Sequence, residues 1–136
     1  MRGITSLNKN FQFQNVYRRG KNFVSPHVVT YVLKKKGGGL RYGITTSKKI
    51  GGAVERNRAR RVIRAAFFEN LPSAQGSYDI VFVARQPAVR IKSSIMAEDI
   101  KYHLEQAQVI KYQNVNGNNR GQIGDKEDTA FLNKLL

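Results

Sequence analysis

The sequence predicts a single small α+β domain in which helices pack on a mixed central sheet, with elements in the order α-β-β-α-β-α. Its 136 residues suffice for one hydrophobic core but are short for two. Because 40% of them are hydrophobic, the chain is not disordered throughout. Segments with helical periodicity alternate with runs of β-branched and aromatic residues, an order typical of an α+β or split βαβ domain.

The first predicted element is a helix over residues 9–19. Asn8 is a candidate N-cap, because an asparagine side chain can accept a hydrogen bond from the first free backbone amides, and Gly20 is a candidate stop. The apolar stripe that would face the core consists of Phe13, Val16 and Tyr17.

Two strands are expected next, on either side of a charged turn. Pro26 disfavours helix in the residue before it, and residues 27–33 (HVVTYVL) predict a strand because they are mostly β-branched or aromatic. The run KKKGGG at 34–39 predicts a turn. Residues 41–47 (RYGITTS) then predict the returning strand of a hairpin.

The second half of the chain predicts a helix, a strand and a last helix. The longest helical pattern covers residues 53–70. Residues 78–84 (YDIVFVA) are almost continuously apolar, as expected of a central strand that is covered on both faces. Ser93 or Ser94 is the candidate cap of a helix that extends to about residue 108. We therefore expect a domain over residues 1–112 and a flexible polar tail over 113–136.

The distribution of charge points to an anionic partner. The formal net charge of +15 lies wholly in residues 1–64, which hold sixteen Lys and Arg and one acid, Glu55. Such clustering indicates a face that binds phosphates, although a solvated basic face without a partner is the alternative. A membrane surface is a weaker candidate, because the predicted helices need their apolar faces for the core. The absence of cysteine excludes disulfides and Cys-ligated metals.

The helix over residues 53–70 has two opposed faces. At 100° per residue, its apolar face comprises Ala59, Val62, Ile63, Ala66 and Phe67. The other face comprises Arg56, Asn57, Arg60, Arg61 and Arg64, with Arg58 apart on the flank. Glu55 is the one acid within reach, so ion pairs inside the helix do not explain this face. Lys48, Lys49 and the backbone amides of Gly51 and Gly52 would add an anion site at the helix N-terminus.

These residues carry a resemblance to a known family. The run SKKIGGAVERNRARRVIRAAF at 47–67, followed by DIVFVARQPA at 79–88, closely resembles the protein component of bacterial ribonuclease P. The segments FQNVYRRG at 13–20 and VVTYVL at 28–33 also match, so that the resemblance covers roughly residues 4–108. A Ser-Lys-Lys motif followed by an Arg-Asn-Arg helix is a far more specific signal than a lone basic run.

The resemblance implies a fold and an activity. The fold is that of the second domain of ribosomal protein S5, with a left-handed crossover between the strands that flank the arginine-rich helix. The general rule for such crossovers would predict a right-handed one. The activity is the endonucleolytic removal of the 5′ leader from precursor tRNA by a ribonucleoprotein. In that enzyme the RNA subunit holds the Mg²⁺ ions and performs the hydrolysis, so no catalytic or metal-binding residue is expected in the protein.

The resemblance also implies two binding surfaces. The residues expected to bind the catalytic RNA are Lys48, Lys49, Arg56, Asn57, Arg58, Arg60, Arg61 and Arg64. Those expected to bind the single-stranded leader of precursor tRNA are Phe13, Tyr17 and Tyr31. From the residues alone, these aromatic rings either stack on unpaired bases or simply belong to the core.

Other functions remain as alternatives. A nuclease acting without RNA would need clustered carboxylates or a histidine pair, whereas residues 1–64 hold a single acid and the two histidines, His27 and His103, lie in different predicted elements. A structural or ribosomal RNA-binding protein would use the same basic helix without a leader cleft. A DNA-binding module fits less well, because recognition helices mix Asn, Gln and Ser with Arg. We expect a cytoplasmic protein, because the N-terminus lacks an apolar signal region. We also expect no membrane association and no obligate protein partner.

Overall fold

The computed structural model describes residues 4–111, which form one five-stranded sheet and three α-helices. In chain order the elements are β1 Ile4–Ser6, α1 Asn10–Arg19, β2 Lys21–Val24, β3 Val28–Lys34, β4 Leu40–Thr45, α2 Ala53–Asn70, β5 Tyr78–Ala84 and α3 Ser93–Gln106. The strands lie in the order β1-β4-β5-β3-β2, so the predicted central strand, β5, does occupy the centre. The tail expected over residues 113–136 lies outside the described residues.

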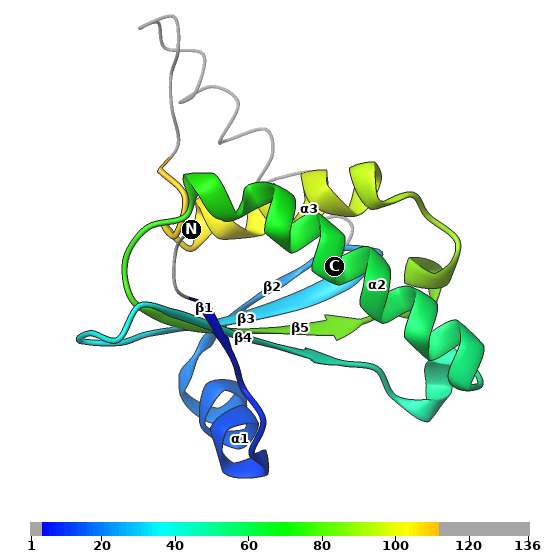
Figure 1. Cartoon of the computed structure of the whole chain (residues 1–136), viewed down its shortest axis with the longest axis horizontal. Helices are drawn as coiled ribbons and strands as arrows, with labels where there is room; N and C mark the ends of the chain where they lie inside the picture. The colour runs from blue at the N-terminus through cyan, green and yellow to red at the C-terminus, as the bar shows by residue number, and fades with distance from the viewer. Residues whose placement is uncertain (1–3, 112–136) are drawn as a thin grey trace, which may run out of the picture.

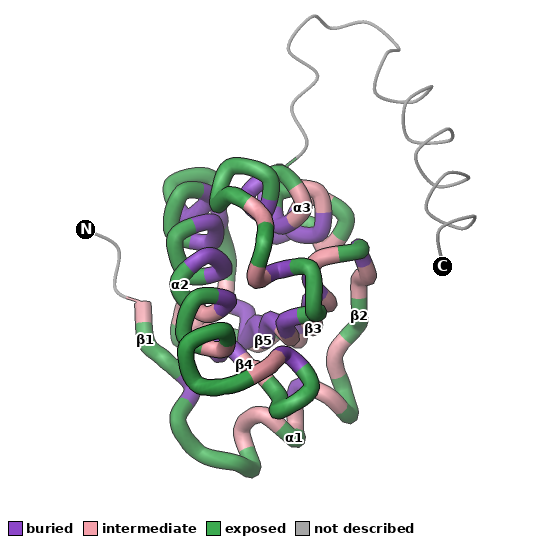
Figure 2. Tube along the Cα trace, turned by 90° about the vertical axis from the view of Figure 1, so that its right-hand side faces the viewer, coloured by how far each residue is buried: buried purple, intermediate pink, exposed green. Residues whose placement is uncertain are grey.

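The helices lie on both faces of the sheet. Figure 1 shows α1 below the sheet and α2 and α3 above it, and Figure 2 shows the same three layers from the side. The strands β4 and β5 are parallel neighbours, and the chain passes between them through α2. In the two views this crossover is left-handed, as the resemblance implies and contrary to the general rule.

The hairpin predicted from residues 27–33 and 41–47 is wrong. The strands β3 and β4 are not neighbours, because β5 lies between them, antiparallel to β3 and parallel to β4. The apolar β5 gains most from the central position, where helices cover both of its faces. The connection from β3 to β4 therefore spans about 10 Å across the end of β5, a distance that its five residues cover easily.

Two edge strands and two helix caps differ from the prediction. The strand β1 pairs with β4 and β2 pairs with β3, but they are only three and four residues long and show no clear alternation. The N-cap of α1 is Lys9, not Asn8, and the Gln12 side chain accepts hydrogen bonds from both of their amides. The N-cap of α3 is Lys92, not Ser93 or Ser94.

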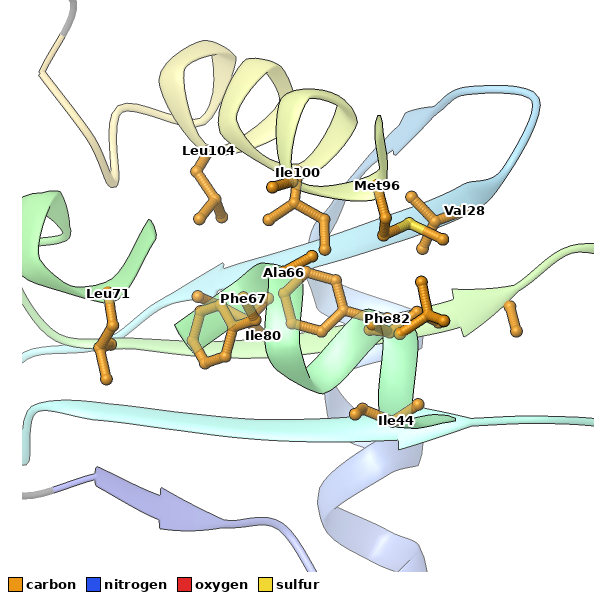
Figure 3. Packing of buried hydrophobic residues seen from close by; sticks show 14 of the residues in the cluster. Val28, Ile44, Ala66, Phe67, Leu71, Ile80, Phe82, Met96, Ile100 and Leu104 are labelled. Atoms are coloured by element: carbon orange, nitrogen blue, oxygen red, sulfur yellow. The ribbon is translucent and has the colours of Figure 1, made fainter. Parts of the chain in front are cut away.

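Two hydrophobic clusters hold the layers together. The larger lies between the sheet and the helices α2 and α3, and Figure 3 shows Phe67 and Phe82 at its centre, with Ile100 above them. The smaller lies between α1 and the sheet around Val16 and Val81, which are fully buried. No helix within residues 4–111 is long and apolar enough to cross a membrane.

Gly20 joins α1 to this arrangement through a close backbone contact. A Cβ atom at this position would lie 2.6 Å from the carbonyl oxygen of Val16 and 2.9 Å from that of Val32. Both atoms belong to the backbone and cannot move aside. The chain therefore needs glycine where α1 turns into β2.

Candidate nucleic-acid interface

The outer face of α2 is the most strongly charged helical surface of the described chain. Its five predicted core residues are buried, and Figure 2 shows the outer side of the helix mostly exposed. Asn57, Arg61 and Arg64 are exposed, and Arg56 is half-buried. Within residues 4–111, no carboxylate forms an ion pair with an arginine of α2.

Two of the arginines are held in place by neutral acceptors. The Nη1 atom of Arg60 donates to the carbonyl oxygen of Ile44 at 3.0 Å, and its Nη2 donates to the Thr46 hydroxyl at 2.9 Å. The Nε atom of Arg58 donates to the carbonyl oxygen of Val89 at 2.6 Å. These bonds orient the guanidinium groups without neutralising them, so their charge stays available to an anion.

The anion site expected from the glycine amides before α2 is absent. The amide of Gly51 donates to the Lys48 carbonyl at 3.2 Å, and the amide of Gly52 donates to the Glu55 carboxylate at 2.9 Å. Both amides therefore already have acceptors within the chain. Lys48 and Lys49 themselves are exposed in a short 3₁₀ helix over Lys48–Ile50.

The three aromatic residues of the predicted leader site come together on the α1 face of the sheet. Phe13, Tyr17 and Tyr31 are all half-buried and pack on the cluster around Val81. The rings of Tyr17 and Tyr31 meet edge to face, with their centroids 5.0 Å apart. They thus form the outer layer of a small core while keeping part of their surface exposed.

Gly43 provides the space in which Phe13 lies. A Cβ atom on Gly43 would lie 2.5 Å from Cε1 of the Phe13 ring, so any larger residue would displace the ring. Since Gly43 is buried in the middle of β4, its lack of a side chain fixes how closely α1 approaches the sheet.

The end of β4 connects the aromatic residues to the arginine face. The Tyr17 hydroxyl lies 2.8 Å from the Thr45 hydroxyl, and the two neighbours of Thr45 bind Arg60. A pocket of about 180 Å³ lies at this edge, lined by Phe13 on one side and by Arg60 and Arg64 on the other. The two predicted surfaces are therefore adjacent.

Asp79 is a charged residue whose setting the sequence did not predict. It is only 2% exposed in β5, although aspartate is seldom buried so completely. Burial disfavours its charged form, but hydrogen bonds and charge from Arg41 and Lys35 outweigh that effect and lower the pKa of the Asp79 carboxyl. Only the pairing of β4 with β5, which places Arg41 opposite Asp79, could have revealed this contact.

The two histidines lie on the other side of the molecule from α1. His103 is buried in α3, with its Nδ1 atom 2.7 Å from the Thr30 hydroxyl. Burial lowers the pKa of His103 to about 4, although Asp99 and the Val24 carbonyl act in the opposite direction. His27 pairs with Asp99 at 2.5 Å. Within residues 4–111, no group of three or more His, Asp or Glu side chains is placed to hold a metal ion.

Comparison with known proteins identifies the family to which these features belong. Residues 1–108 match the family described as Ribonuclease P. The ribonuclease P protein component of Pelotomaculum thermopropionicum is 38% identical over 109 residues, which cover 80% of this chain and 97% of that protein.

Solved structures agree with this family match. The structure of the Staphylococcus aureus RNase P protein superposes with a TM-score of 0.68 and 32% identity, covering 78% of this chain and 97% of that one. The RNase P protein from Thermotoga maritima, at 21% identity and a TM-score of 0.64, shares the fold. The α+β architecture, the left-handed crossover and the arginine-rich helix are thus accounted for together: the chain belongs to the bacterial ribonuclease P protein family.

Proposed function

We propose that this protein, as a subunit of ribonuclease P, binds the catalytic RNA through α2 and the single-stranded leader of precursor tRNA through Phe13, Tyr17 and Tyr31. The observation that carries the proposal is the face of α2, which presents arginines that no carboxylate within residues 4–111 neutralises. Family membership supports the role as a subunit of the ribonucleoprotein.

The chemistry of α2 suits an RNA backbone. Guanidinium groups bind phosphate oxygens with two parallel hydrogen bonds, and each neutralised phosphate releases condensed counterions. Arg60 is already oriented by the end of β4, so less conformational freedom is lost on binding than for a free side chain. Lys48 and Lys49 extend the same charge beyond the start of the helix.

The aromatic residues suit an unpaired strand. Bases stack on exposed aromatic surface with roughly 1–3 kcal/mol each, and stacking tolerates different base sequences. Such tolerance fits leaders that differ from one precursor tRNA to the next. Because this surface adjoins the arginine face at the end of β4, one RNA subunit and one leader can be held side by side.

In this proposal the protein positions the RNAs and the RNA subunit performs the hydrolysis. Mg²⁺ bound by that RNA would activate the attacking water and stabilise the leaving oxygen. The protein's arginines contribute charge neutralisation that holds the RNA subunit. Stacking on the leader raises the affinity for the precursor over that for the mature product, which has no leader.

The experiment that tests the proposal is reconstitution with a bacterial ribonuclease P RNA at low Mg²⁺. We expect the full-length protein to raise the rate of precursor-tRNA cleavage and to tighten precursor binding, while the protein alone cleaves nothing. Binding of the RNA without any gain in cleavage or precursor affinity would favour a structural RNA-binding protein. Sustained cleavage by the RNA-free protein would contradict the assignment of catalysis to the RNA.

A further inference from the structure

The helix α1 divides one face of the sheet into two parts. Strand pairing places the α1-facing side chains in three rows across β3, β5 and β4, and the middle row is Tyr31, Val81 and Gly43. On one side of that row lie Thr45 and the ring of Tyr17, where the leader is proposed to bind. The row on the other side consists of Leu33, Asp79 and Arg41.

A cationic groove lies on this second side of α1. Its volume is about 690 Å³, and its lining includes five basic side chains and a single carboxylate. The basic residues are Arg19 from α1, Lys34, Lys35 and Lys36 from the end of β3 and the following turn, and Arg41 from β4. The groove therefore carries a clear excess of positive charge, although neither α2 nor the aromatic residues contribute to it.

Asp79 gives this groove a fixed framework. Its carboxylate accepts from Nε and Nη2 of Arg41 at 2.8 and 2.7 Å and lies 3.0 Å from Nζ of Lys35. One buried carboxylate orients two cations in this way but balances the charge of only one of them. Cations held in place bind an anion at a smaller entropic cost than freely rotating side chains do.

The path of the chain explains why three consecutive lysines reach this groove. Because β5 separates β3 from β4, the turn between them crosses the end of β5 next to Asp79. In the hairpin that the sequence predicts, the same lysines would lie at a free rim. Gly38 and Gly39, with φ values of 94° and 73°, allow the chain to turn back into β4.

An exposed aromatic ring lies beside the groove. Phe11 is 68% exposed, and it precedes the groove residue Asn15 by one turn on the same side of α1. A basic groove flanked by an aromatic ring is the arrangement with which proteins bind single-stranded nucleic acid without strict sequence preference. A membrane would fit poorly, because the charge lies in a concave site and not on a flat amphipathic surface.

We infer that this groove, Arg19, Lys34–Lys36 and Arg41 around Asp79, is a second binding site for single-stranded RNA, separate from α2 and from the Tyr17–Tyr31 surface. The inference rests on the proposed function only in taking RNA as the partner. The strand would belong either to the catalytic RNA or to a distal part of the leader. Both present the same chain of phosphates and unpaired bases.

The test compares two double charge reversals in the full-length protein. Lys34→Glu with Lys36→Glu changes the groove at exposed positions and leaves Lys35, Arg41 and Asp79 intact. The control pair is Lys92→Glu with Lys101→Glu, which makes the same change of net charge. Both lysines are exposed, Lys92 at the N-cap of α3 and Lys101 within that helix. The probe is a labelled single-stranded RNA of roughly ten nucleotides, a length in the range of single-strand binding sites.

We expect the groove variant to bind the oligonucleotide at least about tenfold more weakly than the wild type. Its plot of log affinity against log salt concentration should also be shallower by about 1.4, the contribution of two phosphates on a single strand. The control pair should change affinity much less, and Phe11→Ala should weaken binding several-fold. If the groove variant loses no more affinity than the control pair, the inference is wrong.

Two further arms identify the source of the strand. One measures the affinity of both variants for the ribonuclease P RNA, and the other compares precursor tRNAs with a short and a long leader in the assembled enzyme. A groove-specific loss in the first arm assigns the site to the catalytic RNA, and a loss confined to the long leader assigns it to the substrate. Groove-dependent oligonucleotide binding without any gain in tRNA cleavage would refute the proposed function and leave this inference standing.

A folding control keeps the comparison valid. Both pairs of side chains are exposed, so thermal unfolding should occur at nearly the same temperature in the two variants. Lys34→Ala with Lys36→Ala provides a milder variant that adds no carboxylate near Asp79, and it should reproduce the weaker binding. Recovery of wild-type affinity in that alanine variant would contradict the inference.

Discussion

Tyr17 and Tyr31 belong at once to the core and to the surface. Their rings pack against each other and on Val81, and the Tyr17 hydroxyl is held by Thr45, yet both side chains keep exposed area. Removing either ring therefore changes stability as well as binding. A useful variant must separate these two effects.

Tyr31 allows that separation. We expect Tyr31→Ala to weaken binding of a precursor tRNA that carries a leader by roughly tenfold, since stacking on one base contributes about 1–3 kcal/mol. Tyr31→Phe retains the ring and should bind nearly as well as the wild type. Affinities for precursor and mature tRNA, measured in the reconstituted enzyme, check this prediction. An equal loss for both RNAs would remove Tyr31 from the leader site.

His103 makes the stability of the fold depend on pH. Because its pKa is lowered to about 4 in the folded protein, the histidine stays neutral there while the unfolded chain takes up a proton near pH 6.5. The unfolded state thus binds more protons between these values, and the free energy of unfolding falls as the pH decreases. The full stabilisation is present above about pH 6.5.

The corresponding prediction concerns His103→Gln, which keeps a polar group near Thr30 but cannot titrate. Between pH 7 and pH 5 the wild type should lose about 2 kcal/mol more unfolding free energy than the variant does. Urea unfolding at the two pH values measures this difference. Identical pH dependence in both proteins would show that His103 does not titrate as the structure indicates.

At the scale of elements, the two faces of α2 have different roles. One face fills the main core and the other presents charge, while Arg58 and Arg60 fasten the helix to the loop after β5 and to the end of β4. We therefore expect exposed and fastened arginines to respond differently to substitution. The difference distinguishes charge that binds RNA from charge that also stabilises the fold.

Arg61→Ala and Arg64→Ala should each weaken binding to the RNA subunit, with little effect on the free energy of unfolding. Each should also make the slope of log affinity against log salt concentration shallower by about 1. Arg60→Ala should do the same and also lower the free energy of unfolding by about 1 kcal/mol, because it loses its hydrogen bonds to Ile44 and Thr46. Lys101→Ala on α3 is the control. Binding isotherms at several salt concentrations and urea unfolding are the measurements. Unchanged salt dependence in the α2 variants would contradict the RNA-binding role.

The elements themselves were predictable to different degrees. The observed bounds of α2 are those predicted, because eighteen residues of consistent periodicity outweigh any local ambiguity. The strands β3, β4 and β5 were located to within one or two residues, but β1 and β2 were not, since such short edge strands exist only through their partners. The caps of α1 and α3 depend on side chains and backbone angles that several neighbouring residues could have provided.

At the scale of the whole molecule, the net charge of +15 opposes folding unless anions neutralise it. We expect about 20 mM sulfate to raise the midpoint of thermal unfolding by roughly 5 °C, because anions bound to the native state stabilise it by mass action. Sodium chloride at the same ionic strength is the control. An equal rise in both salts would indicate general screening and no specific anion site.

The sequence by itself determined the fold class, the long basic helix and the family, because periodicity, composition and the Ser-Lys-Lys and Arg-Asn-Arg motifs are local properties of the chain. The boundary of the domain at residue 112 and the flexibility of the tail stay predictions. The tertiary structure alone decided which strands are neighbours, and with that the contact of Asp79 with Arg41 and the position of the three lysines beside it. Strand order depends on which apolar strand is covered on both faces, and that is settled by all the helices packing together, not by any one segment.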